Sequence, residues 1–263
     1  MSAVIRDQDV VAQTPPRRRR SWAGYLTMPA FLALVCLGLY VYVSSQELDS
    51  IEARSLNAES LSTAVWQHIQ LTVVSTVIVL LVAVPLGIVL TRPFTRRIRP
   101  YLLVVLNLGQ AVPTIAILVL LAVAFFFLGF EAAVLGLVLY AVVPVLLNTM
   151  VGLEQVDDSI LEAGRGMGIS RFGVLCRIEL PLSVPIILAG VRTALVINVG
   201  TATLTTYINA GGLGDIIVAG LSTNRFLVQL VGAALTAVLA LSIDYIAGIA
   251  EDLLRPKGLR NLE

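Results

Sequence analysis

Long apolar runs separated by short polar segments dominate this chain of 263 residues. Six runs are long enough to cross a bilayer, because about 20 residues of helix span a hydrocarbon core of about 30 Å. The runs are too long and too little alternating for barrel strands, and an unpaired backbone group in lipid costs several kcal/mol. The sequence therefore predicts an all-α membrane protein with six transmembrane helices, at residues 22–43, 67–91, 101–128, 132–150, 181–206 and 227–250.

Proline residues interrupt three of these runs. The third run is expected to break near Gln110 and Pro113, while Pro85 and Pro144 are expected to be tolerated kinks. Neighbouring groups can satisfy the carbonyls that a proline frees. For Pro113 two interpretations stay open: a tolerated kink, or a break that turns free carbonyls toward a translocation path.

Basic residues are concentrated in one set of the segments that flank these runs. That set consists of the two chain termini, residues 92–99 and residues 151–180. The other set contains only Arg54 and Arg225, and comprises residues 44–65, 129–131 and 207–226. Because basic loops stay in the cytoplasm, six helices with both termini cytoplasmic place every loop consistently. Five or seven helices would put one terminus on the wrong side.

Composition narrows the function further. Only 13% of the residues are charged, about half the share of a soluble domain, so lipid must be the main solvent, and we expect no nucleic-acid partner. The single histidine, His68, excludes a His/Cys metal cage and is expected at the membrane interface. The single lysine, Lys257, is followed by Gly258, which excludes a P-loop. Any ATP that drives this protein is therefore hydrolysed by another one.

The two ends of the chain are predicted to be cytoplasmic tails. Residues 1–21 are polar, contain four consecutive arginines and are expected to be disordered, and residues 253–263 form the second tail. The run at 22–43 has the basic flank of a signal peptide. It exceeds the usual apolar length of about 7–15 residues and lacks a small-residue cleavage site, so we expect a retained helix.

The cytoplasmic segment 157–181 is polar and broken by glycines. Asp157 and Ser159 can cap a first short helix, Gly168 can stop it, and Ser170 can cap a second. The segment therefore predicts two short helices lying across the cytoplasmic face. An amphipathic hairpin that only packs on lipid headgroups is the alternative.

This segment resembles the cytoplasmic signature of binding-protein-dependent ABC importer permeases: Glu-Ala-Ala, three residues, Gly, nine residues, Ile-x-Leu-Pro. Here the third position is glycine and the spacing is kept. The resemblance implies a type I importer permease domain at 65–252, with 22–43 as an extra transmembrane helix. It assigns contact with the ATPase to Glu162, Ala163, Gly164, Gly168, Ile178, Leu180 and Pro181.

The resemblance also implies partners and a location. These are ABC ATPase subunits that bind the ATP, a second permease copy or paralogue, an extracytoplasmic solute-binding protein and the lipid of a bacterial inner membrane. No cofactor is expected in this chain. The stretches at 85–92, 109–118, 139–153 and 189–217 look most like osmoprotectant permeases for glycine betaine, choline or carnitine. A permease for methionine or another small solute is the alternative, and an ATPase-independent channel or scaffold would belong to another class.

Several polar residues within the apolar runs are candidate functional groups. Arg192 and Asp244 lie at similar depth, so we expect either an ion pair or two side chains that snorkel separately to the cytosol. The hydroxyl-rich fifth helix suggests a hydrated path, although hydroxyls can also bond their own backbone. The candidate path residues are Gln110, Pro113, Asn198, Thr201 and Thr203. The resemblance assigns Gly211, Gly212, Gly214 and Asp215 to the outer gate.

Overall fold

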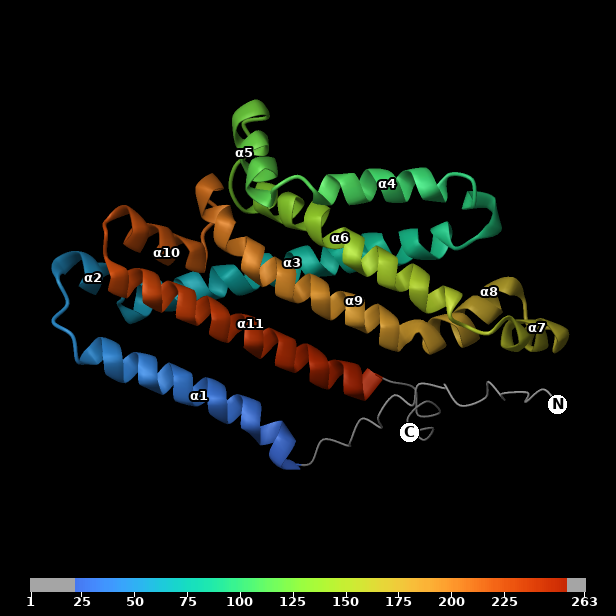
Figure 1. The fold of residues 1–263 in the computed structure, drawn as a ribbon, viewed down its shortest axis with the longest axis horizontal. Coiled ribbons are helices and arrows are strands. Elements are labelled where there is room, and N and C mark those ends of the chain that lie inside the picture. The colour runs from blue at the N-terminus through green and yellow to red at the C-terminus, as the bar shows by residue number, and fades with distance from the viewer. Residues whose placement is uncertain (1–21, 255–263) are drawn as a thin grey trace, which may run out of the picture.

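The computed structural model describes residues 22–254, where all regular secondary structure is helical (Figure 1). The expected tail at 1–21 lies outside the described residues, as does 255–263 in the second tail. The long helices are α1 (Trp22–Ser44), α3 (Ala58–Leu90), α6 (Phe130–Glu154), α9 (Leu180–Thr201) and α11 (Phe226–Leu254). The short helices are α2 (Ser50–Ser55), α4 (Arg99–Gln110), α5 (Thr114–Ala124), α7 (Asp158–Gly166), α8 (Arg171–Val174) and α10 (Leu213–Ser222). Tighter or wider turns form η1 (Pro93–Thr95), the π-helical η2 (Leu175–Glu179) and η3 (Ala202–Ile208).

The centre of the bundle is α6, which packs chiefly against α3 and α9. Small residues let these helices approach closely, as is common in membranes. A Cβ atom on Gly190 would lie 2.6 Å from Cβ of Asn148, and one on Gly87 would lie 2.7 Å from Cγ2 of Thr149. Val143 and Leu146 of α6 are fully buried in the core between them. Glycines on α3 and α9 thus allow the backbones of both helices to lie close to α6.

The third predicted helix is a bent pair. The break lies where Gln110 and Pro113 predicted it, but α4 and α5 meet at 86°, so α5 runs in a different direction from α4 while it packs against α6 (Figure 1). Pro113 is the residue before the first turn of α5, and no residue of α4 is buried. Among residues 22–254, five helices are individually long and apolar enough to cross a membrane, and the bent pair makes a sixth span if counted as one.

The extra helix α1 packs mainly along α11. The Tyr245 hydroxyl donates to the Tyr25 carbonyl oxygen at 2.5 Å, and Leu32 is buried in the contact. Most of the other large apolar side chains of α1, including Leu34 and Tyr40, are exposed. A helix with this pattern faces lipid on most of its circumference.

Short helices mark the two ends of the bundle. In Figure 1 α7 and α8 lie together at one end, and α2 and α10 lie at the other. Basic residues predict that the end with α7 and α8 is cytoplasmic. Coupling and gate candidates are therefore separated by the length of the bundle.

Candidate coupling loop and translocation path

Two short helices form in the predicted cytoplasmic loop, as its capping residues indicate. The Asp157 carboxylate accepts from the Ser159 backbone N–H at 2.8 Å, and the Ser170 hydroxyl accepts from the Gly173 N–H at 3.1 Å. Hydrogen bonds from Ser159, through its side chain and then its backbone, hold the pKa of Asp157 below its usual value. Gly168 has φ of +83°, a conformation that favours glycine. These local rules fix the hairpin of α7 and α8.

The coupling candidates divide into an exposed and a packed group. Glu162, Ala163 and Gly168 are exposed on the hairpin. Gly164 is buried, and a Cβ atom there would lie 2.7 Å from Cδ1 of Ile178. The glycine in the third signature position thus leaves room for the isoleucine of the same signature. Leu180 and Pro181 begin α9, so the signature ends where the next membrane helix starts.

The structure brings Arg192 of α9 and Asp244 of α11 into contact. The guanidinium makes two hydrogen bonds to the carboxylate, and the Nη2–Oδ2 distance is 2.6 Å. Glu251 adds a second carboxylate, 3.9 Å from Nη1. A paired charge costs much less within a membrane than an isolated one. This ion pair therefore joins the two helices at low cost.

Three of the path candidates make hydrogen bonds to nearby backbone in the described residues. Thr201 donates to the Ile197 carbonyl at 2.8 Å and Thr203 to the Gly200 carbonyl at 2.7 Å, so both hydroxyls satisfy their own backbone. Gln110 donates to the Tyr140 carbonyl at 3.3 Å. Pro113 is exposed at the bend. A role in the path stays a prediction for all of them.

Asn198 is fully buried between α9 and α3. Its amide nitrogen donates to the hydroxyl oxygens of Ser75 and Thr76, at 3.0 and 3.1 Å. Its Oδ1 atom is buried without a hydrogen-bond partner among the described residues. The sequence did not reveal this contact because it joins residues more than 120 positions apart.

The expectation that His68 lies at the membrane interface is wrong, because its side chain is fully buried. Its Nδ1 atom accepts from the Leu213 backbone N–H at 3.2 Å, and Nε2 lies 2.9 Å from the Val199 carbonyl oxygen. The acceptor role of Nδ1 leaves the proton on Nε2, which donates to Val199. The packing of α3 against the end of α9 and the start of α10 buries the imidazole, and its two hydrogen bonds replace those it would make with water.

The predicted gate residues lie against the outer half of α3. Gly211 and Gly212 have φ of +81° and +104°, and the Gly212 N–H donates to Oε1 of Gln67 at 3.0 Å. A Cβ atom on Gly214 would lie only 2.1 Å from the Thr203 carbonyl oxygen. These glycines therefore let the backbone approach α3 and η3 closely.

A pocket of about 400 Å³ lies between the start of α3 and the start of α10. Its lining is mostly polar, and the exposed Asp215 carboxylate is part of it. The other lining residues are Glu59, Ser60, Thr63, Ala64, Gln67 and Ile216. Asp215 thus differs from the gate glycines, because it faces a pocket rather than a packed backbone.

The sequence of this chain matches one protein family over more than half of its length. Residues 83–257 match the model of the "binding-protein-dependent transport system inner membrane component" family. The carnitine transport permease protein OpuCD of Listeria monocytogenes is 38% identical over 192 residues, covering 73% of this chain and 85% of that protein. The choline transport system permease protein OpuBB of Bacillus subtilis is 36% identical over 211 residues, covering 79% and 94%.

Solved structures show the same fold at lower sequence identity. An inward-facing structure of the MetNI methionine ABC transporter matches with a TM-score of 0.67 and 22% identity, over 74% of this chain and 96% of that one. An amino acid ABC transporter crystallised with histidines matches with a TM-score of 0.64 and 16% identity, over 79% and 99%. The helical arrangement is therefore that of a type I ABC importer permease.

Proposed function

Because this chain belongs to the family of binding-protein-dependent transport system inner membrane components, we propose that it is the permease subunit of an ATP-driven importer for quaternary-amine osmoprotectants. The observation that supports this substrate class best is the 36–38% identity to permeases named for carnitine and choline. The methionine transporter is only 22% identical, which supports the shared fold and not a shared solute. Glycine betaine, choline and carnitine are the proposed solutes.

The exposed surface of α7 and α8 supports docking of a separate ATPase. Met167 and Phe172 are 74% and 75% exposed, and Glu162 and Ala163 lie on the same hairpin. Exposed apolar side chains rimmed by charge are typical of a protein interface. We therefore assign the docking surface to the signature residues 162–168, while Ile178, Leu180 and Pro181 join it to α9. ATP is bound by the ATPase, and no cofactor is assigned to this chain.

A second permease, either a copy or a paralogue, is the proposed neighbour of α4 and α5. The backbone at Ala111, Val112 and Pro113 leaves the helix at the 86° bend, and all three residues are exposed. Non-helical backbone exposed to lipid is costly, and it occurs at membrane depth where protein or a water-filled cavity covers it. A partner subunit at this bend would supply that cover. The extracytoplasmic binding protein would meet the opposite end from α7 and α8.

An uptake assay in cells that express the complete transporter tests this function. The chain is expressed with its ATPase and binding-protein partners in cells that lack osmoprotectant uptake, and uptake of radiolabelled carnitine, choline, glycine betaine and methionine is compared. We expect ATP-dependent uptake of at least one quaternary amine. Uptake of methionine alone would contradict the proposed substrate class, and uptake without the ATPase would favour a channel.

A further inference from the structure

Arg92, which follows α3, and Arg99, which begins α4, contact carboxylates on either side of the α7–α8 hairpin. Arg92 binds Glu179 with an Nη2–Oε2 distance of 2.6 Å, and Arg99 binds Glu154 with an Nη2–Oε2 distance of 3.1 Å. Glu154 is the last residue of α6, and Glu179 is the last residue of η2 before α9. In the sequence, residues 155–178, which include α7 and α8, therefore lie between these two glutamates.

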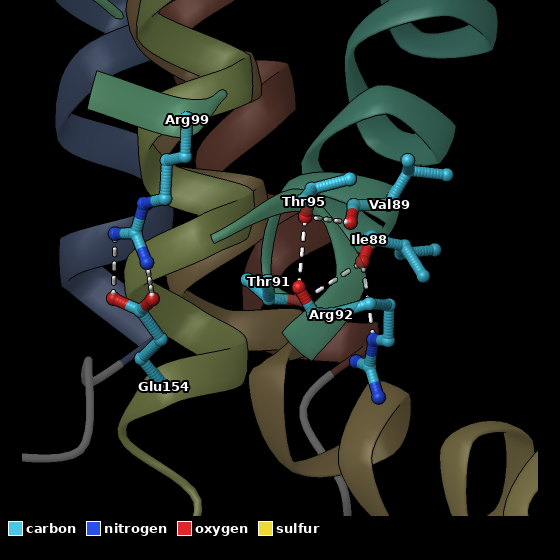
Figure 2. A network of polar contacts seen from close by, with 7 residues as sticks. All are labelled: Ile88, Val89, Thr91, Arg92, Thr95, Arg99 and Glu154. Carbon is cyan, nitrogen blue, oxygen red and sulfur yellow. Dashed lines mark hydrogen bonds and ion pairs between the residues drawn. The ribbon is translucent and has the colours of Figure 1, made fainter. Parts of the chain in front are cut away.

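The Arg92 side chain is oriented before it meets its partner. Its Nε–H donates to the Ile88 carbonyl at 3.1 Å, which leaves both terminal nitrogens for Glu179. The Thr95 hydroxyl lies 2.8 Å from the Val89 carbonyl and 2.8 Å from the Arg92 carbonyl. Figure 2 shows the contacts of Arg92 and Thr95 with the backbone at the end of α3, and the Arg99–Glu154 pair beside them. A guanidinium fixed in this way presents a rigid fork to a carboxylate.

Burial makes the two pairs unequal. The Glu179 side chain is 5% exposed, whereas that of Glu154 is 42% exposed. Removing one partner of a buried pair leaves an uncompensated charge, and this effect is small for an exposed pair. The Arg92–Glu179 pair is therefore the stronger connection, and the Arg99–Glu154 pair supplements it.

Glu179 also lies at an irregular turn. It ends the π-helical segment η2, and its carbonyl accepts from the Ser183 hydroxyl at 2.7 Å. Such single turns of π-helix within α-helices occur frequently at functional sites. This turn joins the coupling loop to α9. The ion pair therefore lies where a movement of the loop would be passed on to α9.

We propose that Arg92 and Glu179 are positioning residues that transmit movement of the coupling loop to α3, with Arg99 and Glu154 making the equivalent connection to α4. The proposal rests on the proposed function, because it assumes that an ATPase moves α7 and α8. When the loop shifts, the two arginines carry α3 and α4 with it instead of letting α9 move alone. Without the Arg92 pair, ATP hydrolysis continues and less solute is moved for each ATP.

The test uses the complete complex of permease, ATPase and binding protein in proteoliposomes. Arg92→Gln and Glu179→Gln are compared with Arg96→Gln and Arg97→Gln, which remove exposed arginines of the same connection that make no ion pair among the described residues. The readouts are ATP hydrolysis stimulated by the binding protein and carnitine imported for each ATP. We expect the ratio to fall about tenfold in the first two variants and to stay unchanged in the two controls.

A purely structural role would give a different pattern. It would lower the yield of assembled complex or reduce hydrolysis and import together, and this outcome would overturn the proposal. Arg92→Lys keeps the charge without the fork and should recover part of the ratio, as should the reversed pair Arg92→Glu with Glu179→Arg. An assembled Arg92→Gln complex with a normal ratio would also overturn it.

A spin label on the exposed Cys176, in a Cys36→Ser background, makes the test independent of the solute. We expect Arg92→Gln to increase the mobility of this label in the assembled complex and Arg96→Gln to leave it unchanged. Equal mobility in both variants would reject the connection. A wild-type complex that hydrolyses ATP without importing carnitine would count against the proposed substrate, while the label still decides whether Arg92 holds the loop.

Discussion

The Nε2 atom of His68 lies 2.9 Å from the carbonyl oxygen of Val199, and the other ring nitrogen accepts from the Leu213 N–H. One imidazole on α3 therefore joins the last turns of α9 to the first turn of α10. The neighbouring Gln67 accepts from the Gly212 N–H, so two consecutive residues of α3 bind residues 212–213 of the predicted gate segment, residues 211–215.

Replacing His68 with alanine should destabilise the protein. The substitution removes the acceptor of the buried Leu213 N–H and the donor to the Val199 carbonyl and opens a cavity, which together cost about 2–4 kcal/mol. Thermal unfolding in detergent measures the change, and Trp66→Ala, which removes a 60% exposed side chain two residues away, is the control. Equal melting temperatures for the two variants would show that the imidazole bonds contribute nothing.

Gly214→Ala should disrupt the start of α10. A Cβ atom there would lie 2.1 Å from the Thr203 carbonyl oxygen, so the backbone must move, at a cost of about 1–3 kcal/mol. Gly200→Ala is the matched control, because no atom lies within 4 Å of the added carbon. Unfolding midpoints of the two variants check this, and a Gly214→Ala protein as stable as the control would refute the close approach.

Reversing the Arg192–Asp244 pair should restore part of the uptake that each single reversal abolishes. Each single reversal places two like charges in contact within the membrane. Recovery should be partial, because the new carboxylate at position 192 would face Glu251, now 3.9 Å from the guanidinium. Uptake normalised to inserted protein is the measurement. A double variant no more active than the two single variants would count against the ion pair as the cause of the single losses.

Gly168→Val should abolish uptake while leaving membrane insertion intact. Valine is strained at φ of +83°, so the turn between α7 and α8 must change shape. Gly38→Val on α1, where no atom lies within 4 Å of an added carbon, is the control for insertion. Normal uptake by the inserted Gly168→Val protein would argue against coupling through this turn.

Asp49→Asn should lower stability at neutral pH and have no effect in strong acid. The backbone hydrogen bond from Glu52 lowers the pKa of Asp49, and the charge of Arg225, 2.6 Å away, adds to this effect. A lowered folded-state pKa means that the carboxylate stabilises the fold above its usual pKa of 3.8 and loses this effect as pH falls through the lower value. Unfolding midpoints of both proteins between pH 7 and pH 3 should therefore converge. A constant difference would disprove the assignment.

Much of the fold followed from local sequence rules. Apolar length predicted the membrane helices, Asp157, Gly168 and Ser170 predicted the hairpin, and Pro113 predicted the break before α5. The 86° bend did not follow, because a proline fixes where a helix is interrupted and not the direction of the next one. The 3₁₀ segment that follows Thr201 also carries no composition signal that distinguishes it from α-helix.

Parts of the site that are formed by residues close in sequence could be predicted. Contacts between segments far apart in the chain could not. Local capping residues predicted the hairpin of α7 and α8, whereas the contacts of His68, Asn198 and Glu179 depend on packing between helices far apart in the chain. A lone histidine near the end of an apolar run has the same local pattern whether it is buried or interfacial. For Arg192 and Asp244, similar depth in the membrane was enough to suggest contact, because isolated charges there are costly.

Photo-cross-linking from position 167 tests the central claim most directly. Met167 is 74% exposed at the tip of the hairpin and can be replaced by a photoreactive amino acid without removing a buried contact. In membranes that contain the whole transporter, we predict a covalent adduct between this position and the ATPase subunit. An adduct with the extracytoplasmic binding protein instead would contradict both the orientation of the chain and the proposed coupling role of α7 and α8.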